Sequence, residues 1–157
     1  MLKLIAQQLD RWIAEQNRHF RQEGLPLLAP CTIKVIGQAA LLDAGLPVAL
    51  AVTNDVDVRA DYESAVEQAF ARLLVQAGRT LDPVGHEAWM PRETRYKEHF
   101  KGPFVRLLLA EPEAILLSKA LKAPDKNRAL ITEYLTQPSE RFLELAEKYQ
   151  LDLEQFL

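Results

Sequence analysis

The order of hydrophobic and polar positions in the first third of the chain predicts a helix, a strand and a second helix. Apolar residues recur at helical spacing through residues 2–22, and this helix is expected to end before Gly24. Residues 31–36, CTIKVI, are rich in β-branched side chains and predict a half-buried strand. Residues 38–44, QAALLDA, then predict a short apolar helix that is closed by Gly45.

The next segment combines one ambiguous run with a clear strand and a helix. Residues 48–52 are apolar throughout, and the pattern leaves a strand and a loop as alternatives. Residues 55–59 alternate polar and apolar side chains, which is the period of a strand. Residues 61–77 carry an apolar stripe at helical spacing, and Asp61 is expected to cap the beginning of this helix.

The second half of the chain is expected to become helical after one more buried strand. Residues 79–102 mix Pro, Gly and aromatic side chains, and they predict a short strand at 86–90 and a loop or helical turn through 93–99. Residues 104–109, FVRLLL, predict a buried strand. Three helices and a short terminal segment that packs back are expected beyond it: a helix from Pro112, helices over 125–136 and 138–149, and residues 151–157.

This order of elements predicts one α+β domain, in which a small mixed β-sheet is covered by helices. A length of 157 residues suits one domain with a proper core, and no Gly/Ser-rich linker divides it. We therefore expect an N-terminal helix in residues 1–24, the sheet core in residues 31–109 and a helical C-terminal half in residues 111–157.

Composition narrows the compartment and the partners. Cys31 is the only cysteine, so an internal disulfide is excluded and a reducing compartment is expected. Charged residues interrupt the N-terminal apolar positions too early for a signal peptide or a membrane span, which predicts a cytoplasmic protein with no membrane partner. The net charge of −3 argues against a protein coated in nucleic acid. Residues 92–128 nevertheless hold nine Lys and Arg against five Asp and Glu, a segment that either serves phosphates or forms a solvated face.

The tripeptide Asp55-Val56-Asp57 is the strongest candidate for chemistry. On a strand, alternate residues point to the same face, so the two carboxylates lie roughly 6.5–7 Å apart along the chain. Two carboxylates in that arrangement can share a divalent cation, and Mg²⁺ commonly takes one or two carboxylates together with substrate phosphates. A pair of aspartates on a surface strand is the alternative interpretation of the same tripeptide.

The surroundings of this tripeptide resemble a known superfamily. The segment VIGQAALLDAGLPVALAVTNDVDV resembles the signature of the nucleotidyltransferase superfamily, which has the polymerase-beta-like fold. That signature consists of a strand, a Gly-Gly or Gly-Ser pair that opens a helix, and a later strand with an Asp-x-Asp motif. The segment EPEAILLSKALKAPDKNRALITEYL resembles the Lys-bearing helical region of bacterial stand-alone members. The resemblance covers residues 31–136.

The resemblance implies a fold, a donor and a set of site residues. It implies a nucleoside triphosphate as donor, Mg²⁺ or Mn²⁺ as cofactor, and an acceptor that is an RNA, a protein or a small molecule. Bacterial relatives include toxin and antitoxin components, which implies a partner protein. The site residues that it implies are Asp55 and Asp57 as catalytic metal ligands, with Gly37, Gln38, Lys119 and Lys122 at the nucleotide phosphates.

Two departures from the signature leave three hypotheses open. Gln38 stands where the family has its second small residue, and the strand FVRLLL lacks the third carboxylate that is expected beside the Asp-x-Asp pair. Asp82 is an acid nearby in the sequence but outside the predicted strands, and Glu87 lies in the short strand at 86–90, which the mixed composition of its surroundings defines poorly. The chain is therefore an active nucleotidyltransferase, an inactive domain of that fold that binds a nucleotide or a protein in an antitoxin-like role, or a scaffold with two surface aspartates. A third carboxylate within metal reach of Asp55 and Asp57 would argue against the second hypothesis.

Overall fold

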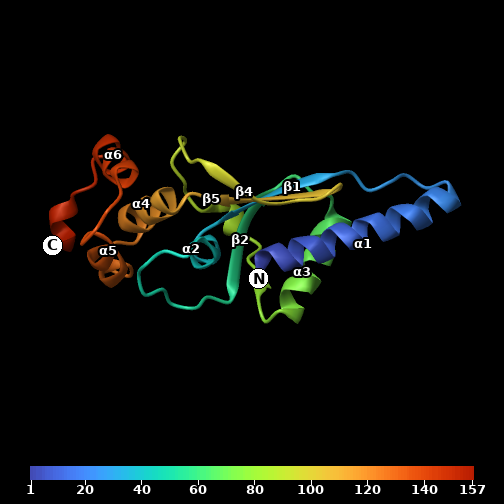
Figure 1. Cartoon of the computed structure of the whole chain (residues 1–157), viewed down its shortest axis with the longest axis horizontal. Coiled ribbons are helices and arrows are strands. Elements are labelled where there is room, and N and C mark those ends of the chain that lie inside the picture. The colour runs from blue at the N-terminus through green and yellow to red at the C-terminus, as the bar shows by residue number, and fades with distance from the viewer.

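The computed structural model describes residues 1–157 as a five-stranded mixed sheet with helices, which confirms the α+β class (Figure 1). The strands are β1 (Cys31–Ile36), β2 (Asp55–Ala60), β3 (Thr80–Leu81), β4 (Tyr96–Lys101) and β5 (Val105–Ala110). Their order in the sheet is β3-β2-β1-β5-β4. β1 is the central strand, antiparallel to β2 and parallel to β5, and β3 extends the sheet in parallel beside β2.

The helices divide into a group that covers the sheet and a group that follows β5. They are α1 (Leu2–Glu23), α2 (Gln38–Ala44), α3 (Ser64–Gln76), α4 (Pro112–Lys122), α5 (Arg128–Tyr134) and α6 (Glu140–Lys148), with 3-10 turns η1 (Gly85–Glu87) and η2 (Leu153–Phe156). Figure 1 shows α1 and α3 together on one side of the sheet, whereas α4, α5 and α6 gather beyond one end of it. No helix has both the length and the apolar character needed to cross a bilayer.

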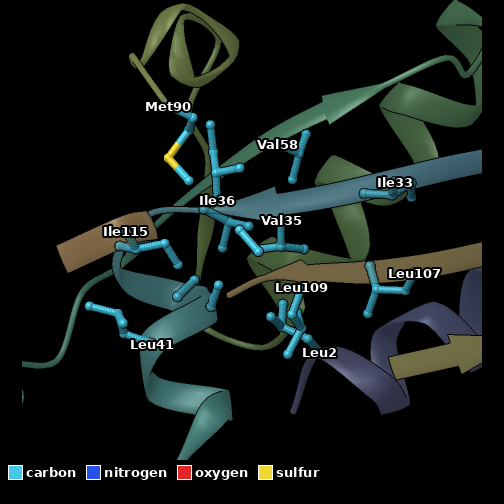
Figure 2. Packing of buried hydrophobic residues seen from close by; sticks show 14 of the residues in the cluster. Leu2, Ile33, Val35, Ile36, Leu41, Val58, Met90, Leu107, Leu109 and Ile115 are labelled. Carbon is cyan, nitrogen blue, oxygen red and sulfur yellow. The ribbon is translucent and has the colours of Figure 1, made fainter. Parts of the chain in front are cut away.

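The two faces of the sheet differ in polarity, and this difference positions the candidate site. Ile33 and Val35 of β1 are fully buried on the face that α1 and α3 cover, and Val58 pairs with Val35 on the same face. Figure 2 shows Val35 with Leu109 of β5 and Leu2 of α1 in this core. The intervening residues of β1 and β2 point to the opposite face, which carries most of the polar side chains.

Most elements predicted from the first half of the sequence are confirmed. The strand predicted at 31–36 and the helix predicted at 38–44 match β1 and α2, and the N-terminal helix matches α1. The run 48–52, for which a strand and a loop were alternatives, is a loop. The last residues pack back as expected, because Phe156 is 2% exposed and its carbonyl accepts a hydrogen bond from Thr132 Oγ1 at 2.8 Å.

The predictions for residues 79–102 are wrong. No strand forms at 86–90, where a 3-10 turn stands instead, and the strand of this region is the two-residue β3 that precedes it. Residues 96–101, expected largely as loop or turn, form the edge strand β4. An edge strand exposes polar side chains and therefore lacks the apolar run that reveals a buried strand.

Asp61 does not cap the third helix, which also corrects a prediction. Its Oδ1 accepts a hydrogen bond from the Thr32 N–H at 2.7 Å and so extends the pairing of β1 with the chain after β2. The helix begins later, at Ser64, with Glu63 at the N-cap. Glu63 makes no side-chain cap bond, and its Oε2 accepts from the Ala29 N–H at 2.8 Å.

Asn17 is the one buried polar side chain of the core, and it should carry measurable stability. Its Nδ2 donates to the Leu28 carbonyl at 3.0 Å, and its Oδ1 accepts from the Leu28 N–H at 2.7 Å. Asn17→Ala leaves both backbone groups unpaired, so we expect a loss of about 2 kcal/mol in the free energy of unfolding. Urea unfolding measures this loss. Gln8→Ala on the exposed side of the same helix is the control, and an equal loss in both variants would contradict the assignment.

Candidate functional site

The alternation of β2 presents Asp55 and Asp57 on the polar face of the sheet. Val56 and Val58 are 0% and 7% exposed on the core side, as the sequence predicts. Asp55 lies exposed at the first position of the strand, whereas Asp57 is partly buried further along. The two carboxylates therefore share a face but differ in their access to water.

Two glycines enclose the carboxylate of Asp57. Gly37, between β1 and α2, has φ 77° and ψ −162°, a backbone conformation in which glycine is strongly favoured. A Cβ at Gly37 would lie 2.8 Å from Oδ2 of Asp57, and a Cβ at Gly85 would lie 2.5 Å from Oδ1. The strand-to-helix glycine that the sequence analysis selected thus touches the Asp-x-Asp motif directly. Gly85 was missed, because its role depends on how η1 folds back onto β2.

Asp82 provides the third carboxylate that the sequence analysis did not place. β3 pairs in parallel with β2 in a register that sets Leu81 beside Val56, so Asp82 comes level with Asp57. The Asp82 N–H continues this pairing by donating to the Val56 carbonyl at 3.0 Å. Its Oδ1 accepts a hydrogen bond from the Val84 N–H at 3.0 Å, which fixes the carboxylate at the turn into η1.

Asp57 is the most perturbed acid of the site. The pKa of Asp57 is raised to about 6. Burial is the largest cause, the hydrogen bond and charge of Asp82 and the charge of Asp55 add to it, and the charge of Lys119 opposes them. Oδ1 of Asp57 is buried without a hydrogen-bond donor. Two adjacent carboxylates repel each other unless a proton or a cation lies between them. A shared proton or a bound cation would therefore stabilise Oδ1 of Asp57 beside Asp82.

Lys119 is the basic residue that faces this acidic group. It is partly buried on α4, and burial lowers the pKa of its ammonium, as does the charge of Lys126, whereas Asp57 raises it. Lys119 and Lys126 line one cavity of about 430 Å³, together with Gln38, Asn127 and the loop at 49–53. Gln38 Nε2 donates to the Ala51 carbonyl at 2.9 Å, so the amide secures that loop.

Lys122 does not join this group. Its Nζ lies 5.0 Å from the centroid of the Trp89 ring, and the side chain is exposed. Trp89 in turn packs edge-on against Tyr149, with ring centroids 5.4 Å apart. Of the four residues that the resemblance places at the phosphates, the structure gathers Gly37, Gln38 and Lys119 around Asp57 and the adjacent cavity.

The donor set suits a cation that takes only part of its ligands from the protein. No group of three or more His, Cys, Asp or Glu side chains is arranged to enclose a metal ion. Asp57 and Asp82 nevertheless face each other, and the buried Oδ1 of Asp57 has no donor. Mg²⁺ is commonly held by one or two carboxylates and completes its shell with water and substrate phosphates, so this pair fits it.

Comparison with known proteins gives no family assignment for this chain. No protein-family model, curated protein or solved structure matches it. Its function must therefore be argued from the geometry of the site.

Proposed function

We propose that this chain has the nucleotidyltransferase fold and transfers a nucleotidyl group from a nucleoside triphosphate to an acceptor hydroxyl with Mg²⁺ or Mn²⁺. The observation that carries the proposal is the position of Asp82 beside Asp57. A third acid beside Asp57 supports the catalytic hypothesis over the inactive one. The contact of Gly37 with Asp57 and the cavity at Lys119 support the same conclusion.

Each residue has a separable role in this reaction. Asp57 and Asp82 would hold the cation, which orients the triphosphate and neutralises the charge that develops during transfer. Lys119 and Lys126, which both line the cavity, bind the phosphates of the donor. The acceptor oxygen forms a bond to the α-phosphorus, the bond from that phosphorus to the bridging oxygen breaks, and pyrophosphate leaves. The hydroxyl proton passes to water or to Asp55, which is exposed on the same face of the strand.

A second candidate function is an inactive domain of this fold that binds a partner protein. Two observations favour it: Gln38 occupies the position of the second small residue, and no three acids are arranged around a common metal position. An antitoxin-like protein would use the cavity at Lys119 to hold its partner rather than a nucleotide. The two candidates differ in whether nucleotide binding requires a divalent cation and Asp57.

Thermal unfolding with nucleotide and metal tests the proposal. A nucleoside triphosphate at a hundred times its Kd adds about 2.7 kcal/mol to the stability of the protein that binds it. For a domain of this size, the melting temperature should rise by several degrees. We expect a rise with Mg²⁺ or Mn²⁺ in the unmodified protein and none in Asp55→Ala/Asp57→Ala. No shift with any of the four triphosphates would leave the protein-binding function as the better candidate.

Asp82→Asn isolates the contribution of the third carboxylate. The substitution keeps the size of the side chain and its acceptor for Val84, but it removes one of the two charges that face the cation. We expect the affinity for nucleotide in the presence of Mg²⁺ to fall at least about tenfold, which corresponds to about 1.4 kcal/mol. Calorimetric titration measures it. Glu87→Gln, at the exposed last residue of η1, is the control and should bind as the original protein does.

A further inference from the structure

The polar face of the sheet carries a row of basic side chains outside the cavity at Lys119. We call this row the basic sheet face and define it as Lys34, Arg59, Lys101 and Arg106. Lys34 of β1 is paired with Arg59 of β2, and Arg106 of β5 is paired with Lys101 of β4. The four residues therefore span the strands β2, β1, β5 and β4, a width of roughly 14 Å at about 4.8 Å between strands.

Most of the positive charge on this face is not neutralised. Arg59 Nε donates to the His86 carbonyl at 3.3 Å and one terminal nitrogen donates to the Ala88 carbonyl at 2.6 Å, so neutral groups hold it in place. Lys34 Nζ lies 4.9 Å from the centroid of the Tyr96 ring. Neither Lys34 nor Lys101 forms an ion pair.

Two acidic side chains lie beside the basic sheet face, but they do not neutralise its positive charge. Glu98 pairs with Arg106 at 2.9 Å, but both side chains are about half exposed, so water screens this pair. Asp61 has one oxygen engaged with the Thr32 N–H. Like charges on neighbouring strands destabilise a sheet. A bound anion would therefore relieve the repulsion between Lys34 and Arg59.

A shallow groove of about 630 Å³ lies over this face. Its wall includes Lys34, Arg59 and Arg106, together with Asp61 and Tyr96. Arg59 stands two positions after Asp57 on β2 and on the same face, but η1 and Ala88 lie over the strand between this groove and Asp57. The groove offers few apolar side chains, Leu108 and Tyr96 among them, which is little for a protein partner.

We propose that the basic sheet face binds the phosphate backbone of a single-stranded nucleic acid, which then serves as the acceptor. A row of cations at strand spacing matches an extended chain of regularly placed negative charges, and such grooves bind single strands largely through their phosphates. The binding itself depends only on the observed charges. The role of the strand as acceptor rests on the proposed nucleotidyl transfer and names the substrate class of that reaction.

Fluorescence anisotropy with labelled oligouridylate and oligothymidylate twelve-mers tests the binding, in EDTA and without nucleotide. We expect both strands to bind, with the affinity falling about 20-fold between 50 and 200 mM salt for three phosphate contacts. The triple variant Lys34→Ala/Lys101→Ala/Arg106→Ala should bind at least about tenfold more weakly at 50 mM salt, with little salt dependence. The control Lys3→Ala/Arg11→Ala/Arg21→Ala removes the same charge from the exposed side of α1 and should bind as the original protein does.

Three outcomes would overturn this proposal. They are the absence of binding at 50 mM salt, an equal loss in the triple variant and its control, and binding of polyglutamate as tight as that of the oligonucleotides. The last outcome would assign the face to an acidic protein. Asp57→Asn should bind the oligonucleotides undiminished in EDTA. Oligonucleotide binding by an original protein that shows no metal-dependent nucleotide binding would overturn the transfer reaction alone, and nucleotide binding without oligonucleotide binding would overturn this proposal alone.

Discussion

Asp57→Asn is expected to give a protein that is more stable at pH 8 than the original and that no longer binds nucleotide with metal. The ordinary pKa of an aspartate is near 3.8, and burial together with Asp82 raises that of Asp57 to about 6. The ionised side chain is therefore held in a place that disfavours its charge. Asparagine removes that charge and can donate a hydrogen bond to Asp82. After allowance for partial solvent exposure, we expect a gain of about 1–2 kcal/mol in the free energy of unfolding.

The sign of this effect depends on pH. Well below pH 3.8 the carboxyl is protonated in both the folded and the unfolded chain, and the original protein carries no penalty. As the pH rises toward 6, the unfolded chain loses its proton first, and the stability of the original protein falls relative to Asp57→Asn. Above about pH 7, where the folded chain has also lost this proton, the difference should be constant. Urea unfolding at pH 4.5 and pH 8 measures it.

The same substitution should abolish the metal-dependent function. A bound cation contributes several kcal/mol to the stabilisation of a transferred phosphoryl group. We expect Asp57→Asn to lose about 4 kcal/mol of this stabilisation, which lowers the rate about a thousandfold. Release of pyrophosphate measures the rate with the acceptor oligonucleotide present. Asp125→Asn, with a side chain that is 96% exposed, is the control. A variant that lost activity together with stability would indicate a structural role for Asp57 instead.

The part of the site that could be predicted from the sequence is the part encoded by local pattern. β1, α2 and β2 follow one another within 30 residues, and each has a clear period, so Gly37 and the Asp-x-Asp pair could be placed at element ends. Asp82 could not be placed, because β3 has only two residues and no period can be read from so short a strand. The available signal was topological. The Thr-Leu-Asp run follows a strand and a helix, and this order favours a short strand that pairs in parallel with β2.

The choice between the two lysines of α4 also required the tertiary structure. Lys119 and Lys122 are three positions apart and share a face of an ideal helix, so spacing alone assigns them the same role. In the folded chain, the ammonium of Lys122 lies over the Trp89 ring. Lys119 instead lies near enough to Asp57 for the charge of that carboxylate to raise the pKa of its ammonium. The basic sheet face was hidden for a similar reason, because its four residues come from separate strands that only the sheet order brings together.

Gly85→Ala should be among the most damaging small substitutions in the chain. A Cβ at this position would lie 2.8 Å from Cα of Asp57 and 2.9 Å from its Cβ, distances that atoms in folded proteins do not adopt. Because one of these neighbours is backbone, η1 and β2 must move apart, and overpacking of this kind typically costs 1–3 kcal/mol. We expect a loss of about 3 kcal/mol in the free energy of unfolding, measured by urea unfolding.

Gly78→Ala provides the matched control for this prediction. Gly78 has φ 75°, but a Cβ there meets no atom within 4 Å, so the substitution introduces backbone strain of about 1 kcal/mol without a clash. An equal loss in the two variants would show that η1 does not press against β2. A larger loss in Gly85→Ala should also bring weaker nucleotide binding in Mg²⁺, because the clash displaces Asp57 itself. Binding that survived this displacement would mean that the nucleotide is held without the acidic pair, by the basic residues of α4 and the loop after it.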